Sequence, residues 1–278
     1  GSVAEQTKQS SIETEYFDVR LLLADDNLTN QQVGIGILNK LGFQVDAVDS
    51  GIEVLSALAD ISYDLVLMDV QMPEMDGLEA TRQIRSANTA NINPDIPIIA
   101  MTAHALGSDR TRCLDVGMND YLTKPIDPAA LATVIHKWLP KTKKVPEQQG
   151  ETEQKKPSTE QPEQTNDADI FDQSDFLQRM MDDTDLANLI LNEFLKDIPT
   201  QIDHLRTMVE QKRTTAAGDQ AHKIKGAASN VGGRSLMNVA STMEKAGKSG
   251  EQETLTKLLP ELEQQFFQLQ KVIKRSTL

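Results

Sequence analysis

Residues 65–77 of the chain read LVLMDVQMPEMDG. Four apolar residues, Leu65–Met68, lead into Asp69, and a Met-Pro pair and an Asp-Gly pair follow. A short continuous apolar run that turn-forming residues close predicts a strand buried on both faces. An isolated acidic pair usually lies in a solvated loop, but a carboxylate at the end of such a strand is much rarer. We therefore take Asp69 as a candidate functional residue.

The same pattern extends on both sides of this stretch, where short apolar runs alternate with segments of helical periodicity. The apolar runs predict strands at Val19–Ala24, Val45–Val48, Leu65–Met68, Ile96–Met101 and Tyr121–Leu122. The helical segments are Asn30–Leu41, Gly51–Ala59, Gly77–Ser86, Ser108–Val116 and Pro128–Leu139. Five βα repeats of this kind predict a parallel sheet with helices on both faces.

A polar segment separates this region from a different pattern. Residues 140–169 hold four prolines but only two hydrophobic residues, so we expect a flexible, disordered linker. Residues 170–278 show helical spacing and no strand pattern, which indicates an all-α helical bundle. Residues 1–16 are polar and open with Gly-Ser, which resembles the remnant of a protease site, so we expect disorder there. The predicted folded domains are residues 17–139 and 170–278.

Length and charge narrow the possible functions. The 278 residues suggest two domains. The net charge of −14 disfavours a nucleic-acid-binding surface, and the excess acidity lies in residues 17–139, with 8 basic against 17 acidic residues. The single cysteine, Cys113, excludes an intramolecular disulfide and fits a reducing compartment. No stretch approaches the ~20 consecutive apolar residues of a membrane-spanning helix.

In a parallel α/β sheet, chemistry gathers at the carboxyl ends of the strands. The predicted strands end close to Asp25, Asp26, Asp69, Thr102 and Lys124. Three converging carboxylates would repel one another and need a cation, and hard oxygen ligands with room for water and a phosphate fit Mg²⁺. Lys124 supplies a positive charge and Thr102 a hydroxyl for the phosphoryl oxygens. A carboxylate nucleophile in this setting predicts an acyl phosphate.

His222 is the second candidate. Helical spacing places it opposite the apolar face of a helix predicted over Thr214–Asn230, beside Gly218, Lys225 and Gly226. Two glycines cost a helix roughly 1 kcal/mol each, so we expect them to clear space for another protein to approach an exposed imidazole. Lys225, one turn on, would neutralise a phosphoryl group on His222.

The motifs of the first domain resemble the receiver domain of bacterial response regulators over residues 18–139. The resemblance rests on Asp25-Asp26, Met68–Pro73, Asp76-Gly77, Thr102-Ala103 and Lys124-Pro125. It implies a flavodoxin-like α/β fold with strand order 2-1-3-4-5 and a cis Lys124–Pro125 bond. The resemblance also implies that Asp69 is the phosphoacceptor and that Mg²⁺ is held by Asp25, Asp26, Asp69 and the backbone carbonyl of Gln71. Thr102 and Lys124 would bind the phosphoryl group. Tyr121 together with Thr102 would form the switch. A haloacid-dehalogenase-type phosphatase is disfavoured, because that family needs an acid where Gln71 stands.

Residues 221–232, AHKIKGAASNVG, resemble the histidine-containing phosphotransfer (HPt) domain, with Lys225-Gly226 at the third and fourth places after His222. This resemblance covers about residues 170–275 and rests on one helix plus the helical pattern. It implies that His222 carries a phosphoryl group.

Together the two resemblances imply a phosphorelay. Asp69 would accept a phosphoryl group from an upstream phosphohistidine. His222 of the same or a neighbouring chain would take this group from Asp69 and pass it to the receiver of a downstream response regulator. The same groups would also allow reverse flow. Such pairs usually end hybrid sensor histidine kinases, so we expect the cytoplasmic tail of an inner-membrane sensor. A free-standing two-domain relay protein is the alternative origin. Any kinase activity would belong to that parent, because this chain has no Gly-rich ATP-binding signature. The alternative is a receiver-controlled module whose helical domain binds a partner protein without carrying phosphoryl; neither reading involves nucleic acid or direct membrane contact.

Overall fold

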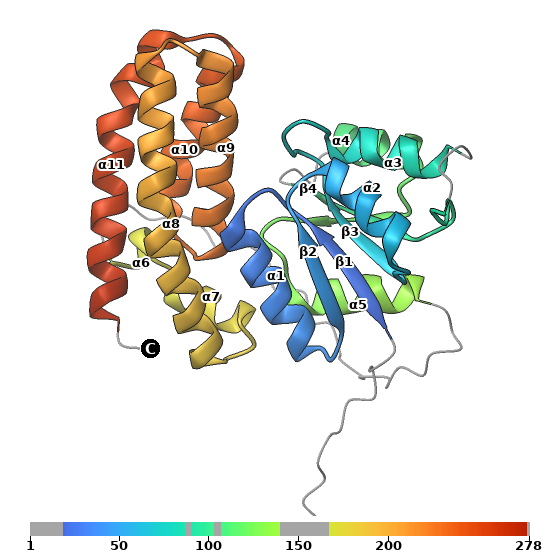
Figure 1. The fold of residues 1–278 in the computed structure, drawn as a ribbon. Coiled ribbons are helices and arrows are strands. Elements are labelled where there is room, and N and C mark those ends of the chain that lie inside the picture. Colours follow the sequence, from blue (N-terminus) through green and yellow to red (C-terminus); the bar gives the residue numbers. More distant parts are fainter. Residues whose placement is uncertain (1–18, 87–90, 103–106, 140–166, 277–278) are drawn as a thin grey trace, which may run out of the picture.

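The computed structural model describes residues 19–86, 91–102, 107–139 and 167–276. These residues form an α/β domain and a helical domain that lie side by side (Figure 1). Residues 1–16 and all but the last three of residues 140–169, which we expected to be disordered, lie outside the described residues. Asp167–Asp169, expected at the end of the linker, instead belong to the short helix α6 (Asp167–Ile170), which we correct here.

The α/β domain contains a five-stranded parallel sheet in the order β2-β1-β3-β4-β5, which confirms the predicted fold class. Its strands are β1 (Arg20–Ala24), β2 (Gln44–Val48), β3 (Leu65–Asp69), β4 (Ile98–Thr102) and β5 (Asp120–Thr123). Its helices are α1 (Leu28–Lys40), α2 (Gly51–Asp60), α3 (Gly77–Arg85), α4 (Gly107–Asp115) and α5 (Pro128–Trp138). Each element lies within three residues of a predicted one.

Helices cover both faces of the sheet, because successive strand residues point to opposite sides. Leu21 and Leu23 of β1 pack into the apolar cluster that contains α1 and α5. Leu22 and Ala24 pack into the opposite cluster, with α2, α3 and α4. Every residue of β3 and β4 is buried, as the continuous apolar runs predict.

Side-chain caps start the helices just after the carboxyl ends of the strands. Asn27 accepts a hydrogen bond from the backbone amide of Asn30, and Asp76 accepts one from that of Glu79. Each satisfies an amide that has no partner within its own helix. These caps leave the strand-ending carboxylates on the same edge of the sheet.

The helical domain is a bundle of long helices preceded by short ones. Its helices beyond α6 are α7 (Gln173–Arg179), α8 (Thr184–Glu210), α9 (Thr214–Asn230), α10 (Arg234–Lys248) and α11 (Gln252–Arg275). One buried face of each long helix supplies the core, with Phe194, Ile224, Met243 and Leu262 all fully enclosed. Among the described helices, none combines the length and the apolar character needed to cross a bilayer.

The two domains meet along α1, which lies beside α8 and α9 (Figure 1). Gly36 on α1 leaves room for Leu186 of α8: a Cβ atom at Gly36 would stand 2.5 Å from a Leu186 methyl carbon. At the end of α1, Lys40 forms a 2.8 Å ion pair with Asp183. The buried apolar residues beneath α1 and those of the bundle form one continuous cluster. The interface between the two domains therefore combines close apolar packing with an ion pair.

Candidate functional site

Three carboxylates gather at the carboxyl edge of the sheet. Asp25 and Asp26 follow β1, Asp69 ends β3, and one oxygen of each lies within 4.8 Å of the others. Asp25 and Asp69 are buried and Asp26 is half-buried. The donors are all hard oxygen atoms, which is the set that Mg²⁺ prefers. The cluster predicted from the strand ends is thus assembled, and its chemistry fits a divalent cation.

Lys124 bridges two of these carboxylates. Its Nζ atom donates to Asp25 Oδ2 at 2.6 Å and to Asp69 Oδ2 at 2.7 Å. The following peptide bond, Lys124–Pro125, is cis, as the resemblance implies. Burial alone would lower the pKa of Lys124, but the two carboxylates outweigh burial and hold that pKa above its ordinary value. Lys124 is therefore a permanent cation at the site.

Asp69 is more weakly acidic than a solvent-exposed aspartate. Burial raises its pKa to about 6, with Lys124 opposing the shift and Asp25 adding to it. The backbone amide of Gln71 donates to Asp69 Oδ1 at 3.2 Å. The charge on Asp69 is thus disfavoured by burial and stabilised by Lys124 and by the Gln71 amide.

The other residues expected on the phosphoryl group and the switch lie at the ends of β4 and β5. Thr102 ends β4 and is buried. Its backbone carbonyl accepts a hydrogen bond from the Lys124 amide at 2.8 Å, which ties the two strand ends together. Tyr121 on β5 is half-buried, and the Arg110 guanidinium carbon lies 5.4 Å from its ring centroid. Within the part of the chain that the structure describes, no hydrogen bond or ion pair joins Tyr121 to the acidic cluster.

His222 lies on α9 with its ring held by α10. Its Nδ1 atom is 3.0 Å from Glu244 Oε1, and Glu244 also accepts from Lys225 at 2.7 Å and Lys248 at 2.6 Å. Burial raises the pKa of Glu244, but its hydrogen bonds to His222, Lys225 and Lys248 outweigh burial and bring that pKa well below its ordinary range. Because an ionised carboxylate only accepts, Nδ1 carries the hydrogen in this contact, and in the neutral ring the lone pair then lies on Nε2.

Sequence reasoning missed Glu244, although a signal was present. Glu244 follows Ala240 by four residues and Leu236 by eight, so it falls on the buried stripe of α10 with Met243. A charged residue inside an apolar stripe needs partners. The expectation that Lys225 is free to meet a phosphoryl group also changes, because Lys225 is paired with Glu244.

The two glycines beside His222 have different surroundings. A Cβ atom at Gly226 would stand 3.3 Å from Asn30 Nδ2 of the α/β domain, so Gly226 does permit a close approach at the interface. A Cβ atom at Gly218 would instead stand 3.1 Å from the Gly247 Cα atom of α10. The structure gives Gly218 a packing role, because its missing side chain lets α9 and α10 approach closely, and its role in access to His222 stays a prediction.

Hydrogen bonds and an ion pair join α9 to the acidic edge of the sheet. Lys223 Nζ lies 2.8 Å from Asp26 Oδ2, and the Lys223 carbonyl accepts from Asn27 Nδ2 at 3.2 Å. Asn230 Nδ2 donates to Asn30 Oδ1 at 2.7 Å. The second half of α9, from Lys223 to Asn230, therefore contacts the start of α1.

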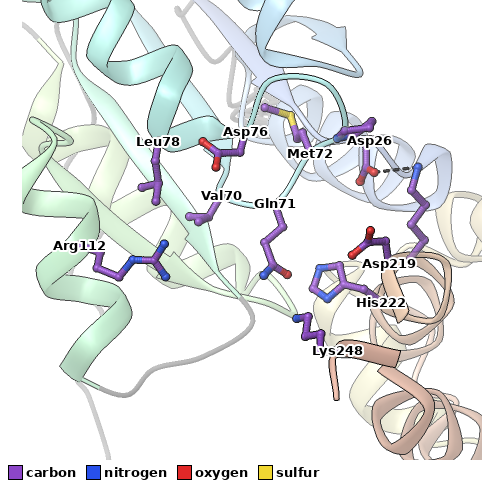
Figure 2. A pocket seen from close by; sticks show the side chains of 12 residues that line it. Asp26, Val70, Gln71, Met72, Asp76, Leu78, Arg112, Asp219, His222 and Lys248 are labelled. Atoms are coloured by element: carbon purple, nitrogen blue, oxygen red, sulfur yellow. Dashed lines mark ion pairs between the residues drawn. The ribbon is translucent and has the colours of Figure 1, made fainter. Parts of the chain in front are cut away.

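A cavity of about 290 Å³ lies between the domains beside His222. The residues that line it come from both domains, and Figure 2 shows His222, Asp219 and Lys248 opposite Gln71 and Asp26. The His222 side chain is only 16% exposed, so the exposed imidazole that we expected is largely buried in this arrangement, where it contacts Glu244. His222 and one carboxylate of the acidic cluster, Asp26, thus line the same open pocket.

Two family models match the chain: the response regulator receiver domain at residues 21–136 and the Hpt domain at residues 189–272. Among curated proteins, sensor histidine kinase GacS of Pseudomonas protegens is 33% identical over 210 residues, which are 75% of this chain and 22% of that protein. Sensor protein GacS of Pseudomonas syringae pv. syringae is 42% identical over 134 residues, which are 48% of this chain and 15% of that protein. The matched part of the chain therefore spans only 15–22% of the length of these relatives.

Solved structures also resemble parts of the chain. The receiver domain of sensor histidine kinase PA1611 from Pseudomonas aeruginosa, solved with a magnesium ion in its active-site cleft, is 42% identical, with a TM-score of 0.40, and covers 43% of this chain and 96% of that one. A co-crystal of the Saccharomyces cerevisiae phosphotransfer protein Ypd1 with the receiver domain of Ssk1 gives a match of 29% identity and TM-score 0.41, over 46% of this chain and 92% of that one.

Proposed function

Because the chain carries a response regulator receiver domain at residues 21–136 followed by an Hpt domain at residues 189–272, we propose that it moves a phosphoryl group between Asp69 and His222 in a phosphorelay. One observation supports this above all: the Hpt histidine faces the edge of the receiver that holds the acidic cluster, across a cavity that both domains line. We assign any kinase activity to a longer parent protein and not to these two domains.

Asp69 is the proposed phosphoacceptor. Its carboxylate oxygen attacks the phosphorus of an upstream phosphohistidine, so that an O–P bond forms as the N–P bond breaks, and the departing imidazole keeps the electron pair. Lys124, already bound to Asp69, stabilises the charge on the phosphoryl oxygens. We assign the Thr102 hydroxyl to the same oxygens, and Tyr121 with Thr102 to the switch that follows phosphorylation.

We infer that Asp25, Asp26, Asp69 and the backbone carbonyl of Gln71 hold Mg²⁺. The support is the donor set, since the carboxylate oxygens of the three aspartates lie within 4.8 Å of one another. When bound, the ion would neutralise charge on the carboxylates and on the phosphoryl oxygens. The residues of the chain supply the remaining elements: Lys124 fixes Asp69, and the Gln71 amide orients Asp69 Oδ1.

His222 is the proposed second carrier. Its Nε2 lone pair attacks the phosphorus of phospho-Asp69, forming an N–P bond while the O–P bond breaks and the carboxylate is restored. Glu244 holds the hydrogen on Nδ1 and stabilises the positive charge that the ring gains as Nε2 bonds to phosphorus. Lys225 acts through Glu244 and meets the phosphoryl group only after it exchanges partners. The reverse reaction uses the same groups.

The proposed partners follow from this chemistry. A histidine kinase core supplies the phosphoryl group to Asp69, and the receiver domain of a response regulator takes it from His222. The proposed setting is the cytoplasmic side of a bacterial inner-membrane sensor.

The test is phosphoryl transfer with identification of the linkage. The protein is incubated with Mg²⁺ and a radiolabelled small acyl phosphate, and the label is divided into alkali-labile acyl phosphate and alkali-stable phosphohistidine. Asp69→Asn should lose both fractions, and His222→Gln should lose only the alkali-stable one. Asp95→Asn and His204→Gln, at exposed positions of the same domains, serve as controls. Label confined to Asp69 in the wild type would favour a helical domain that only binds a partner.

A further inference from the structure

The Hpt domain supplies a cation to the acidic cluster of the receiver. Lys223, the residue after His222, pairs with Asp26 at 2.8 Å, and only 9% of the Asp26 side chain remains exposed. Lys124 pairs with the other two carboxylates, Asp25 and Asp69. The three carboxylates are therefore paired with two ammonium groups, Lys124 of the receiver and Lys223 of the Hpt domain.

A divalent cation in this cluster would lie close to both ammonium groups. Two like charges a few ångströms apart repel strongly where water is largely excluded. Lys124 belongs to the receiver itself and is fixed by two carboxylates, whereas Lys223 is present only while the Hpt domain is docked. Lys223 is thus the cation that a divalent ion can displace.

The hydrogen bonds of the interface reach the same carboxylates. Asn30 donates from Nδ2 to Asp25 Oδ1 at 2.9 Å and accepts at Oδ1 from Asn230 of the Hpt domain. The backbone amide of Asn27 donates a hydrogen bond to Asp25 Oδ1, and the Asn27 side chain donates one to the Lys223 carbonyl. A change in the position of Asp25 or Asp26 is consequently transmitted to the contacts that hold α9.

We propose that Lys223 occupies Asp26 in competition with a divalent cation, so that docking of the Hpt domain and metal binding by the receiver oppose each other. The inference rests on the metal site of the proposed function. By thermodynamic linkage, docking lowers metal affinity by the same factor by which metal weakens docking. Metal loading then uncovers the His222 face for the receiver of another protein, which gives the competition a role in the relay.

The test is a titration of the full chain with MgCl₂, followed by ¹H–¹⁵N NMR. Backbone amides around Asp69 report metal binding, and the side-chain amides of Asn27 and Asn230 report docking. In the wild type, Mg²⁺ should shift both sets with one midpoint. Lys223→Gln should lower the Mg²⁺ dissociation constant at least threefold, and Lys223→Arg should restore the wild-type value. Lys257→Gln, which makes the same charge change at an exposed position of α11, should match the wild type.

Gly36→Leu separates docking from local charge. Its side chain would meet Leu186 and push the domains apart, and it changes no charge at the cluster. This variant should also tighten Mg²⁺ binding at least threefold. A gain in Lys223→Gln alone would mean that only local charge acts and would overturn the linkage, as would Mg²⁺ affinities that stay equal in all variants. Gly36→Leu keeps the test decisive if Lys223→Gln fails to fold.

The measurement needs no phosphoryl transfer, so it is independent of the label experiment. Loss of the linkage with intact transfer from Asp69 to His222 would remove this inference and leave the proposed function in place. An intact linkage with no transfer would do the opposite.

Discussion

His222 Nδ1 and Glu244 Oε1 lie 3.0 Å apart, in a contact between two helices of the bundle. Glu244 is also bound by Lys225 and Lys248, which keep it ionised. The carboxylate can only accept a hydrogen bond, so the contact sets which ring nitrogen is protonated. In the neutral ring this leaves the lone pair on Nε2, the atom that our proposal assigns to phosphoryl transfer, and so links a buried residue of the core to the proposed chemistry.

Glu244→Ala should slow transfer from Asp69 to His222 roughly 10- to 100-fold, because hydrogen bonds to charged groups contribute about 1.5–3 kcal/mol. The ¹⁵N chemical shifts of His222 should show a mixture of tautomers in place of one. Glu263→Ala removes a carboxylate that pairs with Arg206 on the bundle surface, and should change neither readout. An unchanged rate in Glu244→Ala would show that the tautomer does not limit transfer.

Asp69 should titrate with a midpoint near pH 6 in metal-free buffer, because burial raises its pKa. The unfolded chain holds this proton less tightly, so the native state binds more protons between about pH 4 and 6. The contribution of Asp69 to the free energy of unfolding should therefore fall as pH rises through that window. The ¹³C resonance of the Asp69 carboxyl measures the midpoint directly.

Asp69→Asn should accordingly be more stable than the wild type at pH 7 in metal-free buffer, with a smaller difference at pH 4. Trp138, the single tryptophan, lies on α5 and reports urea unfolding of the receiver domain by fluorescence. Asp95→Asn, at an exposed carboxylate, is the control. A less stable Asp69→Asn at pH 7 would contradict the raised pKa.

Two glycines on α9 should respond oppositely to the same substitution. Both changes to alanine favour the helix by up to about 1 kcal/mol. Gly218→Ala crowds Gly247 of α10, so overpacking should lower the free energy of unfolding of the bundle by about 1–3 kcal/mol. Gly226→Ala crowds only the Asn30 side chain across the interface, so it should preserve the bundle and weaken docking. Circular dichroism during unfolding, together with the Asn230 side-chain NMR signal, separates the two results; equal losses of stability would refute the distinction.

Transfer from Asp69 to His222 should be intramolecular, because the two domains belong to one chain and the tether keeps His222 at a high effective concentration near the receiver even when Mg²⁺ weakens docking. The rate at which alkali-stable label forms should not depend on protein concentration. An equimolar mixture of Asp69→Asn and His222→Gln should form that label much more slowly, and at a rate that rises with concentration. A wild-type rate proportional to concentration would instead indicate transfer between chains.

Much of this protein could be predicted from local sequence. Continuous apolar runs such as Leu65–Met68 predict strands buried on both faces, and helical spacing predicts the segments between them. Since parallel strands present their carboxyl ends at one edge, the positions of Asp25, Asp69 and Lys124 in the sequence were enough to predict that they meet. The bundle followed in the same way from its periodic apolar residues.

What the sequence could not provide depends on which helix faces which. Glu244 and His222 are 22 residues apart on different helices, and only the packing of α9 against α10 brings them together. The same packing decides that Gly218 meets Gly247, whereas the docking of the domains decides that Gly226 meets Asn30. Lys223 finds Asp26 across nearly 200 residues of chain. Periodicity and strand ends are properties of a local segment, so the sequence by itself determined the helices, the strands and the acidic edge of the sheet. Which residues meet across separate helices and domains depends on the sum of many packing contacts, so only the tertiary structure decided those pairs.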